Sequence, residues 1–290
     1  MTRLPRGLMA AWRLARDTID VFVANELLSR GAAIAYYTIF SIAPVLIIVV
    51  AVAGLTFGQE AAQGALVEQL SDLMGARSAE VLQAMIESAS SRKAGIWATA
   101  VGFATLLLTA SGVFGEMQAA LNTIWKAALQ RSAVSRIIRG RLTSLGLVLT
   151  FGFLLMVSLV VNAGLSAVHN YINSLFPGAH LLLQALTFLI SLGMITLLFA
   201  AIYKALPDTT IAWRDVTIGA AVTALLFTVG KSAIAFYIGS SAVASSYGAA
   251  GAFAVILVWI YYSAQIFLLG AAFTHAYARR YGSLAVQSPA

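Results

Sequence analysis

The sequence predicts an all-α integral membrane protein with six transmembrane helices, an N-terminal amphipathic interfacial helix, and a helical outer cap between the first two spans. Three observations predict this fold. Of the 290 residues, 60% are hydrophobic and only 10% are charged, against about 25% charged residues in a typical soluble domain. Six apolar stretches are each long enough to cross a bilayer as a helix. Finally, Lys and Arg gather in alternate connecting segments, as positive-inside topology requires.

The N-terminal segment, residues 1–31, is predicted to form a cytoplasmic amphipathic helix. Its apolar side chains recur at steps of three or four residues, and charged residues occupy the flanks. A helix with two such faces lies along the membrane interface. The predicted apolar stripe consists of Leu8, Trp12, Ala15, Ile19 and Phe22.

The transmembrane domain is predicted to cover residues 32–280 and to be followed by a disordered cytoplasmic tail at 281–290. Each span contains about 20 apolar residues or more, which suffices for roughly 30 Å of hydrocarbon at 1.5 Å per residue. The six predicted spans are residues 32–57, 96–121, 142–168, 181–203, 216–238 and 250–273.

The insertion at residues 59–94 reads as two short amphipathic helices that break at Gly75. Five acidic residues make this segment negative, and it carries few basic ones. We therefore expect it to cap the outer face of the bundle. Its acidic residues are Glu60, Glu68, Asp72, Glu80 and Glu87.

The distribution of Lys and Arg predicts the orientation. Fourteen of the 18 basic residues fall in the N-terminal segment, the loops after the second and fourth spans, and the tail, whereas three fall in the insertion. Both termini are therefore predicted to be cytoplasmic. The loop after the second span could also contact anionic lipid, through Lys126, Arg131, Arg136, Arg139 and Arg141.

Two ionisable residues, Lys231 and Glu116, fall within predicted spans, and each is a functional candidate because charge is costly in hydrocarbon. Counting residues along straight helices places Lys231 in the outer half and Glu116 near the cytoplasmic boundary, so a direct pair is not expected. Lys231 could instead extend its ammonium outward to water, and Glu116 could serve structure alone.

Other polar residues sort into two layers that could contact a substrate or could join helices by hydrogen bonds. The outer layer holds Asn162, Gln184 and Lys231, and the inner layer holds Tyr36, Tyr37, Glu116, Gln118, Asn122 and Gln265. Pro44 is expected to kink the first span and free a backbone carbonyl. Tyr247 lies in a stretch of small residues, 239–248, that is either a hinge or an ordinary outer loop.

Enzymatic chemistry is not expected. The chain has no cysteine, and its three histidines fall on opposite sides of the predicted membrane, so no metal or cofactor site is predicted. No phosphate-binding loop or nucleophile elbow occurs. Positive-inside topology already accounts for the basic loop, so nucleic-acid binding is not expected either.

Several motifs resemble the YihY/BrkB family of bacterial inner-membrane proteins, once labelled ribonuclease BN. The similarity runs from about residue 10 to 280, in residues 32–44 (AAIAYYTIFSIAP), 118–125 (QAALNTIW), 203–207 (YKALP), 247–252 (YGAAGA) and 259–266 (WIYYSAQI). The resemblance implies a multi-pass bacterial inner-membrane protein linked to envelope integrity or virulence. Where the family usually has a glutamate after Leu269-Gly270-Ala271, this chain has Ala272, which weakens the case for carboxylate-dependent ion coupling.

The leading functional hypothesis is a transporter or flippase-like protein that moves an amphiphilic envelope component, either a lipid or a glycolipid. One alternative is a cation or proton antiporter that uses Glu116. Another is a non-transporting scaffold that recruits envelope enzymes through the acidic cap. Ribonuclease activity is not expected.

Overall fold

A computed structural model describes residues 6–74, 79–84, 112–127, 180–240 and 248–285. These residues form helices joined by short connections, with no strand among them, so the predicted all-helical class is confirmed. Residues 79–84 and 112–124 are also helical. The longer helices are α1 (Arg6–Ala24), α2 (Leu27–Phe57), α3 (Gln59–Met74), α7 (His180–Ala205), α8 (Trp213–Ser240) and α10 (Gly248–Arg280).

Three helices in the described ranges are long and apolar enough to cross a membrane. Their candidate spans are Gln184–Ala205, Trp213–Ile234 and Phe253–Arg280, which match the last three predicted spans. Helix α2 contains a shorter apolar stretch, Leu27–Ile42. The third predicted span lies outside the described residues, as does most of the second, so the number of six spans and the outer cap stay predictions.

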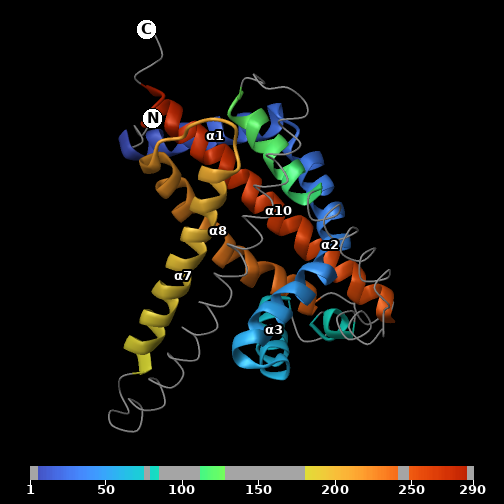
Figure 1. Ribbon diagram of the computed structural model, residues 1–290. Coiled ribbons are helices and arrows are strands. Elements are labelled where there is room, and N and C mark those ends of the chain that lie inside the picture. Colours follow the sequence, from blue (N-terminus) through green and yellow to red (C-terminus); the bar gives the residue numbers. More distant parts are fainter. Residues whose placement is uncertain (1–5, 75–78, 85–111, 128–179, 241–247, 286–290) are drawn as a thin grey trace.

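The helices are arranged around the oblique pair α8 and α10, which pack against each other along their length (Figure 1). Helix α7 packs on α8, and α2 packs on α10. Helix α1 lies across the end of the bundle where both chain termini are found, and it packs on the last turns of α10. The first and last described residues therefore lie at the same end of the molecule.

Two left-handed backbone positions separate consecutive helices. Glu26, at φ 52°, ends the α1 region and lets α2 start in a new direction. At the other end of α2, Gly58 has φ 86° and donates its N–H to the Gly54 carbonyl at 3.0 Å. Glycine adopts this region freely because it has no Cβ. Helix α2 continues as an α-helix through Pro44.

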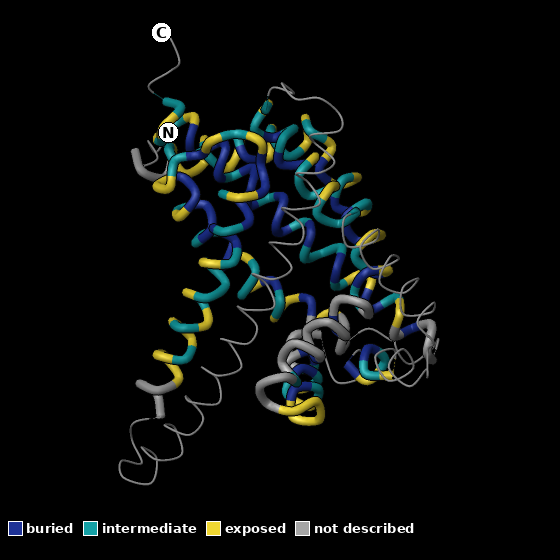
Figure 2. The backbone as a smooth tube through the Cα atoms, viewed as in Figure 1, coloured by how far each residue is buried: buried dark blue, intermediate teal, exposed yellow. Residues whose placement is uncertain are grey.

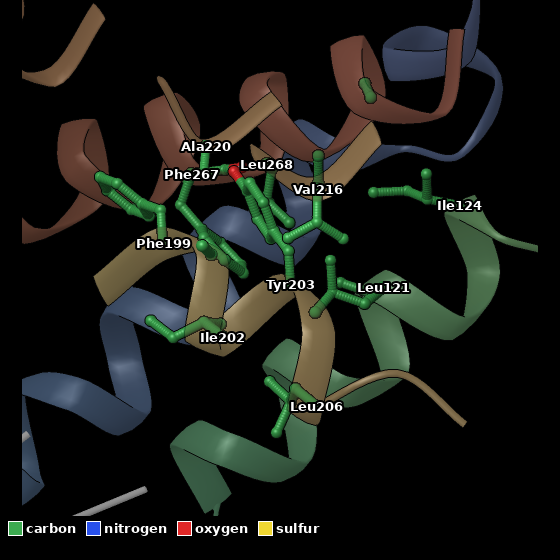
Figure 3. Close-up of a cluster of buried hydrophobic side chains, with 14 of the residues drawn as sticks. Leu121, Ile124, Phe199, Ile202, Tyr203, Leu206, Val216, Ala220, Phe267 and Leu268 are labelled. Carbon is green, nitrogen blue, oxygen red and sulfur yellow. Dashed lines mark hydrogen bonds between the residues drawn. The ribbon is translucent and has the colours of Figure 1, made fainter. Parts of the chain in front are cut away.

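The main hydrophobic core lies where α7, α8, α10 and helix 112–124 meet (Figure 2). Tyr203 stands at its centre with Phe199 and Phe267 stacked nearby, and the Tyr203 and Phe267 ring centroids are 5.4 Å apart (Figure 3). The Tyr203 hydroxyl donates to the Phe267 carbonyl at 2.7 Å and lies 3.1 Å from the Thr223 hydroxyl. These bonds satisfy a fully buried phenol, which would otherwise cost free energy.

Large apolar side chains face outward on α7 and α8. The exposed set on these two helices includes Leu186, Phe188, Leu189, Leu197, Leu225, Leu226, Val229 and Phe236. In water such a surface would favour aggregation, whereas hydrocarbon accepts it without cost. The outward apolar faces therefore support a membrane environment for this chain.

Helix α1 has two distinct apolar surfaces. Thr18 is buried, and Val21 packs against the main core, as does Phe22. Trp12 and Ile19 remain exposed, at 71% and 52%. The expected single stripe is thus divided, because Phe22 turns to the core while Trp12 and Ile19 stay on the outside.

Residues 281–285, which the sequence places in a tail, continue the fold beyond α10. Their backbone amides bond back to the last turn of the helix: Gly282 donates to the Tyr277 carbonyl and Leu284 to the Ala278 carbonyl, at 3.1 and 3.0 Å. Within α8, Asp215 accepts hydrogen bonds from Ser283. These five residues therefore belong to the folded domain.

Candidate functional site

Polar side chains from four parts of the chain join helices in three separate contacts, and we call them the inner polar cluster. Its members come from the start of α2, helix 112–124, the connection between α7 and α8, and the middle of α10. They are Arg30, Glu116, Gln118, Asn122, Asp208 and Gln265.

An ion pair joins α2 to helix 112–124. The Arg30 Nη1 and Glu116 Oε1 atoms are 3.6 Å apart, and the two side chains are only 30% and 25% exposed. Partial burial screens such a pair less than a solvated surface pair, and it makes the loss of either partner costly. The ion-pair partner of Glu116 in the described part of the chain is therefore Arg30. The sequence predicts no direct pair between Glu116 and Lys231, which is consistent with this contact.

A two-way hydrogen bond holds the α7–α8 connection against helix 112–124. The Asn122 amide donates to Asp208 Oδ2 at 2.9 Å, and its Oδ1 accepts the Asp208 backbone N–H at 2.8 Å. Gln118 adds a weaker bond to the same carboxylate at 3.3 Å. An amide can donate and accept hydrogen bonds at the same time, so Asn122 is well suited to this position.

We expect Asn122→Asp to destabilise the protein by about 1–2 kcal/mol. The substitution removes the donated N–H and sets a second carboxylate against Asp208. A thermal unfolding series in detergent measures the loss. Ala119→Asp is the matched control, since it adds the same charge at an exposed position on the same helix. Equal losses in the two variants would show that the Asn122–Asp208 contact contributes nothing.

Gln265 connects α10 to the first turn of α2. Its Nε2 donates to the Leu28 carbonyl at 3.2 Å, and its buried Oε1 has no hydrogen-bond partner among the described residues. Gly31 makes this approach possible, because a Cβ at that position would lie only 2.1 Å from Gln265 Nε2. Gln265 therefore joins two helices, as amides often do in membranes.

Tyr36 and Tyr37 both point away from the core. Their rings are exposed and meet edge to face at 5.8 Å, and Tyr36 makes a similar contact with Phe40 at 5.1 Å. Tyr37 also lies against Gly112 of the neighbouring helix, since a Cβ there would lie 2.8 Å from the ring. Tyr37 therefore lies between α2 and helix 112–124.

Lys231 is half-buried on α8, and no ion-pair or hydrogen-bond partner for its ammonium lies in the described part of the chain. The preceding residue, Gly230, packs on Tyr262 and Ile266 of α10. The Lys231 backbone therefore adjoins the stretch of α10 that carries Gln265, although residue counting assigned the two to different layers. Counting assumes upright helices, whereas α8 and α10 run obliquely in the bundle (Figure 1).

The remaining site residues predicted from the sequence are not part of the inner polar cluster. Gln184 is exposed on α7. Lys126 is exposed at the end of helix 112–124, in a left-handed conformation with φ 49°. Asn162, Tyr247, Arg131, Arg136, Arg139 and Arg141 lie outside the described residues.

Sequence reasoning missed three acidic partners. Asp208 is described above, and Asp17 pairs with Arg280 at 2.7 Å. Asp215 is fully buried, and its Oδ2 accepts the Ser283 N–H and hydroxyl at 3.0 and 2.6 Å. Its place in the first turn of α8 signalled a favourable helix-dipole position but not its burial.

Basic and aromatic residues gather at the end of the bundle that α1 crosses. Lys204 lies over the Trp213 ring at 5.3 Å and bonds to the Ile211 carbonyl. Trp125 meets His275 edge to face at 5.2 Å. Among the described residues, no group of three or more potential metal ligands occurs.

Comparison with known proteins reveals similarity over nearly the whole chain. A family model described as virulence factor BrkB matches residues 18–290. A UPF0761 membrane protein of Alcanivorax borkumensis is 30% identical over 249 residues, covering 85% of this chain and 56% of the relative. A second, from Tolumonas auensis, is 32% identical over 178 residues, covering 61% and 56%.

A third UPF0761 membrane protein, from Verminephrobacter eiseniae, is 29% identical over 271 residues and covers 91% of this chain. The chain spans 56% to 62% of the length of these three relatives. No solved structure matches.

Proposed function

The chain belongs to the virulence factor BrkB family of membrane proteins, and from this premise we propose that it is a flippase-like transporter of an amphiphilic envelope component, a lipid or glycolipid. The proposed role is not enzymatic. Its proposed location is the bacterial inner membrane, with both termini in the cytoplasm.

This proposal rests mainly on one observation: Lys231, a charged residue, lies within an apolar candidate membrane span. The span Trp213–Ile234 contains Lys231 with no partner among the described residues. An unpaired charge at the centre of a membrane helix costs about 2.5–3.5 kcal/mol, less toward the interface. The phosphate of a passing amphiphile would offset that cost by pairing with the ammonium.

The basic residues at the α1 end of the bundle support the same proposal. The basic residues at helix ends or in connections of the described chain there include Lys126, Lys204, Arg214, Arg279 and Arg280. Lys204 lies over the ring of the exposed Trp213. Basic residues near an anionic leaflet attract its headgroups by about 1 kcal/mol each. We include in the proposal an anionic-lipid contact at Lys126 and the basic residues that follow it in the sequence.

Glu116 fits an antiporter less well. Its carboxylate pairs with Arg30, so protonation would leave that guanidinium without its partner in a partly buried place. The ion pair therefore favours a structural role for Glu116, in joining α2 to helix 112–124.

Lipid movement in reconstituted vesicles tests the proposal. Lys231→Met should lower the rate of labelled-lipid movement by about tenfold or more, because it removes a charge-assisted contact of roughly 1.4 kcal/mol or above. Lys231→Arg should keep most of the rate, and Ser232→Ala, at an exposed neighbouring position on α8, should behave as the unsubstituted protein.

Absence of lipid movement by the unsubstituted protein would contradict the proposal, and an unchanged rate in Lys231→Met would remove its carrying observation. If the protein moves no lipid but a stable partner protein co-purifies through the acidic insertion, the scaffold alternative replaces it.

A further inference from the structure

A groove lies between α1 and the last turns of α10. Figure 1 shows α1 crossing this end of the bundle. Its volume is about 380 Å³, which falls within the roughly 300–1,000 Å³ typical of small-molecule sites. Two of its lining residues are apolar, two are acidic and two are basic. They are Val21, Ala276, Asp17, Asp20, Arg279 and Arg280.

The charges in the groove do not all pair with one another. Arg280 and Asp17 form a close ion pair at 2.7 Å and neutralise each other. Among the described residues, the ion-pair partner of Asp20 is Arg16, at 4.0 Å, and both of those side chains are at least 70% exposed, so that pair holds Asp20 weakly. Arg279 has no ion-pair partner among the described residues.

The groove therefore presents one available carboxylate and one available guanidinium. Because both side chains line one groove of about 380 Å³, a small ligand complementary to both carries an anion and a cation. Guanidinium groups bind phosphate through parallel N–H bonds, and a primary ammonium donates N–H bonds to a carboxylate. A phosphoethanolamine group supplies both charges. A phosphocholine group has no N–H to donate, and a phosphoglycerol group has no cation.

The position of the groove favours a membrane lipid as the source of that group. Helix α1, which forms one wall, exposes Trp12, Ile19 and Val23 at helical spacing on the side away from its buried Thr18. An amphipathic helix of this kind lies in the bilayer interface, and its depth there is that of lipid headgroups. The exposed apolar residues can meet acyl chains while the groove meets the headgroup.

We propose that this groove binds the phosphoethanolamine headgroup of a phospholipid, with the phosphate on Arg279 and the ammonium on Asp20. The site is separate from Lys231, and the inference does not depend on transport. Protein that moves no lipid can still hold this headgroup.

Native mass spectrometry of the purified full chain in detergent tests the proposal. The probes are phosphatidylethanolamine, phosphatidylcholine and phosphatidylglycerol with identical acyl chains, at equal concentrations. Phosphatidylethanolamine should be retained about fivefold more than phosphatidylcholine, as expected for one partly solvated charge contact. Phosphatidylglycerol, which is anionic, measures the general attraction to the basic residues at this end of the bundle. Equal retention of phosphatidylethanolamine and phosphatidylcholine would overturn the proposal.

Two substitutions separate the two contacts. Asp20→Asn should reduce phosphatidylethanolamine retention to the level of phosphatidylcholine and leave phosphatidylcholine unchanged. Arg279→Gln should lower retention of both. Asp20 and Arg279 are exposed, so neither substitution should alter the unfolding temperature, which is measured in parallel.

Arg13→Gln is the matched control, since it removes a charge from an exposed position on α1 that does not line the groove. It should retain lipid as the unsubstituted protein does. If Arg13→Gln lowers retention as much as Arg279→Gln, the interaction is a general attraction to basic residues, and the groove is not a site.

Discussion

Gly270→Ala should lower the free energy of unfolding by about 2–4 kcal/mol. Gly270 of α10 faces the centre of the main core, where a Cβ would lie 2.0 Å from the Thr223 hydroxyl and 2.6 Å from the Tyr203 hydroxyl. Both hydroxyls belong to fully buried, hydrogen-bonded side chains, so neither can move aside cheaply. Relief of the clash would separate α8 from α10 and break the hydrogen bond from Tyr203 to the Phe267 carbonyl (Figure 3).

The measurement is unfolding in mixed detergent, followed by loss of helical signal. Gly193→Ala is the matched control, because Gly193 lies on α7, another candidate span, with no described atom within 4 Å of an added Cβ. That variant should be neutral, or more stable by up to about 1 kcal/mol, from the better helix propensity of alanine. If Gly270→Ala and Gly193→Ala change the stability equally, α8 and α10 do not approach each other at Gly270 as closely as in this structure.

Asp215→Ala should destabilise the protein by about 2–3 kcal/mol and release residues 281–285. The Asp215 carboxylate is fully buried and accepts two hydrogen bonds from Ser283. Alanine would leave the Ser283 N–H without its acceptor and remove a negative charge from the first turn of α8, where the helix dipole favours one. Hydrogen exchange at the Ser283 amide should speed up by more than the global loss of stability explains.

Ser283→Ala supplies the matching half of a double-mutant cycle. Alone it removes the hydroxyl donor and should cost about 1 kcal/mol. Combined with Asp215→Ala it should cost nothing further, because the acceptor is already absent. Additive losses would show that the two residues do not interact and that residues 281–285 are held by other contacts.

The inner polar cluster shows how far sequence reasoning reaches. Glu116, Asn122 and Gln265 were expected to share one layer, and the structure ties each of them to another part of the chain. Their partners were not expected. Asp208 lies in the connection after α7, where no helical periodicity indicates which way its side chain points. Arg30 enters the sequence argument only as one of the basic residues on the predicted cytoplasmic side.

The relation between Lys231 and Gln265 was harder to predict for a geometric reason. Residue counting gives position along a helix, and it gives depth only if the helix stands upright. Helices α8 and α10 are oblique in the bundle, so residues from different counted layers adjoin the same stretch of α10.

The amino-acid sequence alone determined that the chain lies in a membrane, that it is helical, and approximately where the last three spans begin and end. These properties follow from composition and from the length of the apolar runs. The tertiary structure alone decided which side chains pair: Arg30 with Glu116, Asn122 with Asp208, and Asp215 with Ser283. The physical reason is that a membrane helix such as α7 is apolar around most of its circumference. Its periodicity therefore does not mark the inward face, and helix rotation and crossing are set by close contacts such as Gly270 on Thr223.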